Sequence, residues 1–300
     1  MSHPGIWPWA LGTTQGREFA RALGLIVRHT QGLPLSGWET SLRLSPGQIR
    51  PNRLLLGFSP HGVADQRVLG LPQFLGMPQA GALAFARHGL SARSILLAAE
   101  MGKDDIELKA YLQFDPALPP PERGLVMRGY KWSAAPGAPA AAAGTPSRVS
   151  RVSDYRRLDH GPLELLALLR AHAAVCAPVR PAYALAEHAL NRALACHPGL
   201  YPDIWKVSEQ DSQRASYCIR LYESGLCLAD LASGLQTLTK GWSLQDRLTP
   251  DVWKSMGPRP LGWIAAGLDG QGDPFVTLYC EASRSDAWQL MTLGEMYEQK

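Results

Sequence analysis

The clearest pattern in the chain is an alternation of apolar and polar positions in residues 261–282. Two apolar-rich runs flank the segment 269–273, whose two glycines and two aspartates suit the positive-φ positions of a hairpin loop. In the second run Val276, Leu278 and Cys280 share one face of a strand. The opposite face carries Phe275, Thr277, Tyr279 and Glu281. The pattern therefore predicts an antiparallel hairpin with one apolar face and one mixed face.

The same hairpin pattern recurs in residues 94–114 and 203–223, with segments of helical periodicity between the hairpins. The segments predicted to be helical are 14–29, 65–74, 79–89, 162–176, 181–197, 226–242, 250–256 and about 283–297. Paired strands separated by helices favour an α+β fold, a closed antiparallel β-barrel of repeated αββα units with the helices outside. Closure removes unpaired edge strands, and the mixed strand faces would then line a lumen.

Charged residues in otherwise apolar strands mark positions that face this lumen. Arg53, Lys109 and Arg220 occur in matching phase on three different predicted strands. A cation among apolar strand residues needs a partner, so the three together predict an anion-binding site. Glu39 lies on a further predicted strand, and tyrosines with lumen phase follow at Tyr111, Tyr222 and Tyr279.

Length and charge limit the classes of function. The chain has 300 residues, 46% of them hydrophobic, and a formal net charge of +4. We expect one domain spanning 1–300, with a Pro/Ala-rich loop insert at about 134–147 whose uncharged low-complexity sequence offers little to pack. The mild positive charge suits an anionic small ligand and falls short of a nucleic-acid-binding signature. No apolar run reaches the roughly 18–20 residues of a membrane span, so we expect neither a nucleic-acid nor a membrane partner.

The cysteines indicate a reducing compartment. There are five, an odd number, and they form no CxxC pair. Their spacing from the histidines matches no zinc site, so we expect no metal ligands among the side chains. The first residues lack the basic and apolar segments of a secretory signal. We therefore expect a cytoplasmic protein with reduced thiols.

Four local motifs carry a resemblance to a known family. Glu39 precedes Arg53 by fourteen residues, and Arg53 opens the apolar strand RLLLGF. The other motifs are ELKAY at 107–111, IRLYE at 219–223 and VTLY at 276–279. With the αββα order, they resemble the ABBA, or prenyltransferase-barrel, family, and within it the cyanobactin-type peptide prenyltransferases. The Pro/Ala insert departs from that subgroup, as does Arg220, where the subgroup often has another polar residue.

The resemblance implies transfer of a dimethylallyl or geranyl group from its diphosphate to a side chain of a macrocyclic peptide, in natural-product biosynthesis. Arg53, Lys109 and Arg220 would bind the diphosphate, and Glu39 would act as general base. Tyr111, Tyr222 and Tyr279 would shield the allylic cation. The resemblance leaves room for Mg²⁺ bound through the diphosphate, and it implies a monomer.

Two other functions fit the same residues. One is an aromatic prenyltransferase that acts on a small indole or phenol. The other is a non-catalytic barrel that binds a hydrophobic ligand. Three cations facing the lumen disfavour the second, because a lipid-binding lumen needs no converging positive charge.

Overall fold

A computed structural model describes residues 14–30, 32–33, 35–50, 53–59, 64–101, 106–115, 124–134, 151–245, 250–282 and 286. Within them, no helix is long and apolar enough to cross a membrane. The predicted helix at 283–297, apart from residue 286, and most of the predicted insert at 134–147 lie outside the described residues.

The strands pair in a closed order. Neighbours are β11-β10-β9-β8-β7-β6-β5-β4-β3-β1-β2, and β11 also pairs with β1. This confirms the predicted α+β fold, a closed antiparallel barrel with helices outside. The strands are β1 Leu35–Ser45, β2 Gln48–Arg50, β3 Arg53–Phe58, β4 Ala92–Met101, β5 Ile106–Phe114, β6 Leu125–Ala134, β7 Arg151–Arg157, β8 Ile204–Glu209, β9 Ala215–Arg220, β10 Leu261–Leu268 and β11 Pro274–Glu281.

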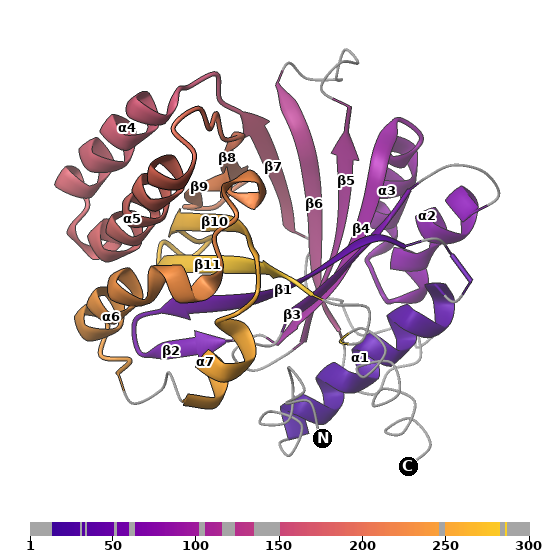
Figure 1. The fold of residues 1–300 in the computed structure, drawn as a ribbon. Coiled ribbons are helices and arrows are strands. Elements are labelled where there is room, and N and C mark those ends of the chain that lie inside the picture. Colours follow the sequence, from indigo (N-terminus) through magenta and orange to yellow (C-terminus); the bar gives the residue numbers. More distant parts are fainter. Residues whose placement is uncertain are drawn as a thin grey trace. The chain divides into compact units, whose positions relative to one another are not determined.

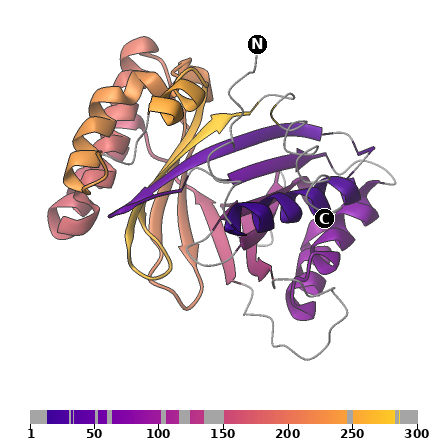
Figure 2. The ribbon, with the colours of Figure 1, turned by 90° about the horizontal axis from the view of Figure 1, so that it is seen from below.

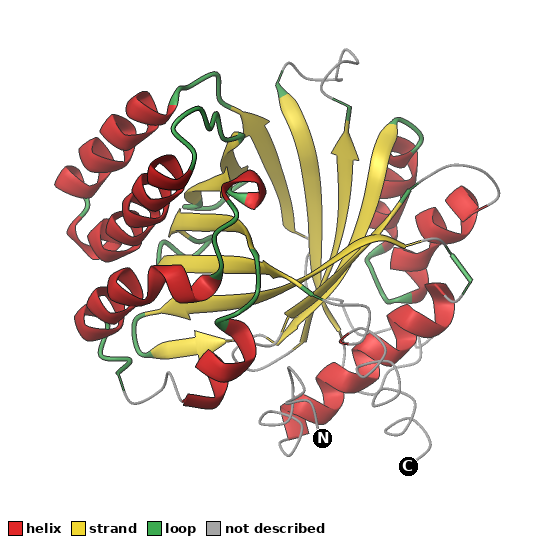
Figure 3. Cartoon of the chain, viewed as in Figure 1, coloured by secondary structure: helices red, strands yellow, loops and turns green. Residues whose placement is uncertain are grey.

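The helices lie between strand pairs, as the periodicity predicts. Figure 3 shows the helices in red and the strands in yellow. The α-helices are α1 Thr14–Thr30, α2 Ala64–Phe74, α3 Gln79–Gly89, α4 Pro162–Val175, α5 Arg180–Cys196, α6 Ala232–Gly241 and α7 Pro250–Met256. Short 3₁₀ turns occur at η1 Ala177–Val179, η2 Tyr222–Ser224 and η3 Leu228–Leu231.

The chain forms two compact units. Unit 1 comprises residues 1–6, 40–51 and 155–281, and unit 2 comprises residues 7–39, 52–154 and 282–300. Strands β1 and β7 have residues in both units. The prediction of one domain over 1–300 stays a prediction, and we describe each unit by itself.

Unit 2 packs α1, α2 and α3 against one face of its strands (Figures 1 and 2). Tyr130 and Trp132 on β6 point to these helices: Tyr130 meets the Phe85 ring edge-on at 5.4 Å, and the Trp132 indole donates to the Leu75 carbonyl at 2.9 Å. Because strand side chains alternate, the intervening residues of β6 occupy the opposite face, which we call the inner face of unit 2.

Unit 1 packs α4–α7 against one face of β8–β11 (Figure 1). Ile264, Val276 and Leu278 are fully buried on this side. The opposite face, called the inner face of unit 1, carries Trp263, Phe275 and Tyr279, as the alternation in the sequence predicts.

The loop between β10 and β11 forms as predicted. Asp269 Oδ1 accepts hydrogen bonds from the backbone N–H groups of Gln271 at 3.0 Å and Asp273 at 3.1 Å. Gly272 has a φ of 85°, a conformation that glycine adopts without steric cost.

Two features of the strands differ from the sequence analysis. Strand β7 was not predicted, because its polar sequence RVSDYRR lacks a strong apolar alternation. The third hairpin was extended to Glu223, but β9 ends at Arg220 and Tyr222 begins the 3₁₀ turn η2. That turn ends at Gly225 in the left-handed region, a stop signal that the sequence already carried.

Candidate functional site

The inner face of unit 2 carries charged side chains in register. Arg53 on β3 lies opposite Glu100 on β4, and Glu100 lies opposite Glu107 on β5. One row further, Lys109 on β5 lies opposite Lys131 on β6. We call the set the charged patch, and it consists of Arg53, Glu100, Glu107, Lys109, Lys131 and Arg151.

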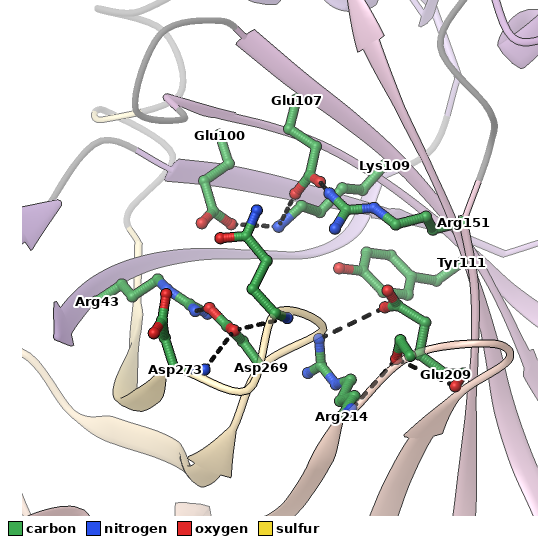
Figure 4. Close-up of polar contacts among 12 residues, drawn as sticks. Arg43, Glu100, Glu107, Lys109, Tyr111, Arg151, Glu209, Arg214, Asp269 and Asp273 are labelled. Atoms are coloured by element: carbon green, nitrogen blue, oxygen red, sulfur yellow. Dashed lines mark hydrogen bonds and ion pairs between the residues drawn. The ribbon is translucent and has the colours of Figure 1, made fainter. Parts of the chain in front are cut away.

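Lys109 lies at the centre of the charged patch (Figure 4). Its Nζ is 2.5 Å from Glu100 Oε2 and 2.8 Å from Glu107 Oε2. Arg151 reaches the other Glu107 oxygen at 2.8 Å, and Arg53 Nε is 3.8 Å from Glu100 Oε2. The side chains of Arg53 and Lys109 are only 6% and 9% exposed, so water screens these charges weakly.

The charges hold one another ionised. Burial by itself raises the pKa of Glu107, but Lys109, Lys131 and Arg151 together hold that pKa well below its usual range. Burial lowers the pKa of Lys109, yet Glu100 and Glu107 raise it above its ordinary value. Four cations and two carboxylates give the charged patch a net charge of +2. The patch therefore suits an anion with more than one negative charge.

Tyr111 extends the charged patch along β5. Its hydroxyl accepts a hydrogen bond from Arg53 Nη2 at 3.4 Å, and the residue is 3% exposed. Tyr111 lies on the same strand face as Lys109, two residues further along. The predicted diphosphate ligands Arg53 and Lys109 and the predicted aromatic Tyr111 are thus brought together within one unit.

Glu39 belongs to the same unit. It is half-buried on β1, which pairs with β3. A Cβ on Gly57 of β3 would lie 3.0 Å from Ser36 Oγ, so these two residues mark the pairing. Counting along two antiparallel strands from that contact places Thr40 opposite Arg53, with Glu39 one residue away. The predicted carboxylate and the predicted cation therefore lie on neighbouring strands.

Glu100 and Lys131 were missing from the sequence prediction. Strand phase places Glu100, the penultimate residue of β4, on the same face as Leu96 and Ala98, but its place between Arg53 and Lys109 follows only from the register between strands. Lys131 was overlooked because the sequence at 124–132 was interpreted as a strand through the face that carries Arg128, Tyr130 and Trp132. Arg128 on that face is held by Asp154 at 2.7 and 2.8 Å.

Aromatic rings dominate the inner face of unit 1. The indoles of Trp205 on β8 and Trp263 on β10 are 4.2 Å apart between centroids, and Tyr155 meets Trp205 edge-on at 6.3 Å. Cys218 on β9 lies opposite Trp205, and its small side chain leaves room for the indoles to meet. Tyr279 on β11 lies opposite Trp263. We call Tyr155, Trp205, Trp263 and Tyr279 the aromatic row.

Two arginines approach Phe275 beside the aromatic row. The Arg43 guanidinium carbon is 4.1 Å from the ring centroid and that of Arg214 is 5.6 Å away. Arg43 also forms an ion pair with Asp269 at 2.9 Å (Figure 4). The sequence prediction included neither arginine.

Arg220 and Tyr222 occupy different surroundings from those predicted. Arg220 is 40% exposed and forms ion pairs with Glu223 at 2.8 Å and Asp203 at 3.9 Å. Tyr222 is in a 3₁₀ turn rather than on a strand, and its ring packs on Gly262, where a Cβ would lie 2.3 Å from the ring. Because Arg220 is far more exposed than Arg53 and Lys109, water screens its charge more strongly, and its assignment as a diphosphate ligand stays a prediction.

Solved structures with a similar fold include the crystal structure of 5-dimethylallyltryptophan synthase from Streptomyces coelicolor. It aligns with a TM-score of 0.57 and 12% sequence identity over 91% of this chain and 97% of that chain. The chain has the fold of the ABBA, or prenyltransferase, barrel. At 12% identity the likeness shows the fold alone.

Two further structures align less well. AnaPT from Neosartorya fischeri gives a TM-score of 0.46 at 12% identity, over 82% of this chain and 78% of that chain. NotF in complex with brevianamide F and DMSPP aligns with a TM-score of 0.47 and 12% sequence identity, over 84% of this chain and 82% of that chain. No protein-family model matches the chain, and no curated protein sequence matches it either.

Proposed function

We propose that the protein is a prenyltransferase that moves an allylic prenyl group from its diphosphate to an acceptor. The observation that carries the proposal is the charged patch of unit 2, which has a net charge of +2 and in which Arg53, Lys109 and Lys131 are buried. When the allylic C–O bond breaks, negative charge develops on the departing diphosphate. Buried, preorganised cations stabilise that charge far better than water does.

Arg53, Lys109 and Lys131 are the proposed diphosphate ligands. Before the donor binds, Glu100 and Glu107 hold Lys109 by ion pairs, so the cation stays ordered on the inner face. A magnesium ion would enter with the diphosphate, because both carboxylates already engage Lys109.

Glu39 is the proposed general base. As the acceptor nucleophile forms its bond to the allylic carbon, it loses a proton, which Glu39 takes up. Tyr111, next to Arg53, and Tyr279, in the aromatic row, are the proposed shields of the allylic cation, since aromatic faces attract cations.

A peptide side chain is the proposed acceptor, and the motifs shared with cyanobactin-type enzymes support it. A small indole or phenol is the second candidate. The paired indoles of Trp205 and Trp263 favour it, because stacked aromatic surfaces suit a flat aromatic ligand. The name of the Streptomyces synthase, which refers to a prenylated tryptophan, points the same way.

Incubation with dimethylallyl or geranyl diphosphate tests the proposal. Diphosphate release is measured without acceptor, and mass spectrometry then detects prenylated products from linear and cyclic peptides and from free indoles and phenols. We expect slow donor hydrolysis alone and a prenylated product with one acceptor class. Arg170→Met is the control, because Arg170 is an exposed residue of α4 paired with Glu187.

A hydrophobic-ligand carrier would behave differently. It would bind geraniol as tightly as geranyl diphosphate and release no diphosphate. That result would overturn the proposed function.

A further inference from the structure

Arg214, just before β9, is a buried arginine with unused hydrogen-bonding capacity. Its side chain is 9% exposed, and its Nε has no hydrogen-bond partner among the residues that the structure describes. Its ion-pair partner, Glu209 Oε2, is 3.9 Å from Nη1 (Figure 4). That distance is too long for a hydrogen bond, so the ion pair does not use the directional donors of the guanidinium.

Ser216, two residues further on, repeats the pattern. It is 1% exposed, and within the described part of the chain its Oγ also has no hydrogen-bond partner. Ser216 lies on the inner face of unit 1, opposite Gly267, and the Arg214 guanidinium reaches the Phe275 ring on that face. More than nine in ten buried polar groups are hydrogen-bonded, so two such donors two residues apart point to a ligand at this place.

The surroundings of these donors are aromatic. The Phe275 ring lies against Arg214, and the Arg43 guanidinium lies against the same ring. Burial disfavours the charged form of Arg214, but the nearby Tyr155, Cys218, Glu209 and Tyr279 raise its pKa. The guanidinium therefore stays charged in a setting that water screens weakly.

The local charge distinguishes this site from the charged patch. Arg43 and Arg214 are two cations, and Asp269 and Glu209 are two carboxylates, so the four sum to zero. A diphosphate requires a larger excess of positive charge. A carboxylate carries one charge, and its planar oxygens match a guanidinium, while a serine hydroxyl can donate a further bond.

We propose that Arg214 Nε and Ser216 Oγ bind a carboxylate group of the acceptor. The inference rests on the proposed prenyl transfer and narrows its substrate class. It favours acceptors with a free carboxylate, such as a linear peptide or a single amino acid, over a backbone-cyclised peptide without an acidic group.

Matched acid and amide acceptors test this inference. The acceptors are tryptophan, tyrosine and linear tryptophan-containing peptides, each with a free C-terminal carboxylate or as the C-terminal amide. A charge-assisted hydrogen bond predicts that wild-type protein prefers the acid by roughly 10- to 100-fold in kcat/KM. Arg214→Met should abolish this preference by lowering the rate with the acid and leaving the rate with the amide nearly unchanged.

Ser216→Ala keeps the test informative if Arg214→Met fails to fold. Removing a buried hydroxyl without a partner should not lower the melting temperature. The variant should nevertheless lose several-fold of the preference for the acid. Arg170→Met should keep the full preference, because its arginine lies on the outer surface of α4.

Donor hydrolysis separates the two possible failures. If wild-type protein releases diphosphate but uses each acid and its amide equally, the carboxylate site is wrong and prenyl transfer stands. If it neither releases diphosphate nor forms product, the proposed function fails, and the carboxylate site falls with it. A preference for acids that survives in both Arg214→Met and Ser216→Ala would also overturn the inference.

Discussion

The inner face of unit 2 and the inner face of unit 1 have the same construction and different chemistry. Both are faces of antiparallel hairpins whose other face packs on helices. Unit 2 places Lys109 between Glu100 and Glu107 there, whereas unit 1 places Trp205 against Trp263. Alternation thus decides only which residues face inward, and side-chain identity then decides whether the face suits a diphosphate or a flat apolar group.

The charges of the two faces sharpen the contrast. The charged patch of unit 2 has a net charge of +2. In unit 1 the positive charges of Arg43 and Arg214 are cancelled by the negative charges of Asp269 and Glu209. The comparison predicts that substitutions in unit 2 alter diphosphate chemistry, and that substitutions in unit 1 alter stability and acceptor preference.

Glu39→Gln should have the largest effect. The amide preserves the shape and removes the base, so prenyl transfer should slow by about 100- to 10,000-fold. Donor hydrolysis without acceptor should survive, because it depends on the cations. Diphosphate release without acceptor measures donor hydrolysis, and the amount of prenylated product with acceptor measures prenyl transfer. Transfer at the wild-type rate would show that Glu39 is a bystander.

Trp205→Ala should reveal the structural role of the aromatic row. Trp205 is 8% exposed and contacts both Trp263 and Tyr155, so truncation should lower the free energy of unfolding by about 3–5 kcal/mol. Trp205→Phe should lower the free energy of unfolding by a smaller amount than Trp205→Ala. Urea unfolding gives both values, and a change below about 1 kcal/mol for the alanine variant would contradict the packing described here.

Glu107→Gln should change how stability depends on pH. The folded-state pKa of Glu107 is depressed by Lys109, Lys131 and Arg151, against the effect of burial. Its ionised form therefore adds stability above the unfolded pKa, and that stability is lost as pH falls toward the folded pKa. Wild-type protein should exceed the variant in stability at pH 7, and the difference should shrink below pH of about 4.5. A difference independent of pH from 7 to 3 would contradict this assignment.

Deletion of 135–144 with a short linker should have the smallest effect. The uncharged Ala/Pro sequence offers few side chains that pack specifically, and shortening a loop changes closure entropy little. Thermal melting and donor hydrolysis should stay close to wild type. A fall in melting temperature of more than a few degrees would show that this segment contributes to stability.

Much of the fold could be predicted from the sequence, because apolar and polar residues alternate clearly in strands that have one apolar face. Val276 and Leu278 on one side of β11 and Phe275 and Tyr279 on the other lie as predicted. The polar strand β7 was missed because its alternation is weak. Tyr222 was placed on a strand because the stop at Gly225 was given too little weight.

The candidate site was less predictable, because it depends on register between strands. Arg53 and Lys109 could be assigned to one face, but the partner that connects them, Glu100, follows from cross-strand pairing. Arg214 precedes β9 in the β8–β9 turn region, where sequence alternation gives no side-chain direction. Its significance comes from burial, which one sequence does not display.

Binding of inorganic pyrophosphate tests the central claim most directly. Isothermal titration compares wild-type protein with Lys109→Met and with Glu107→Gln/Lys109→Met, which removes the cation without leaving Glu107 charged. Trp205→Phe and Arg170→Met are the controls, and circular dichroism checks that each variant is folded. We predict a loss of roughly 10- to 100-fold in affinity for both Lys109 variants and little change for the controls. Wild-type affinity in both folded Lys109 variants would contradict the assignment of the charged patch as the diphosphate site.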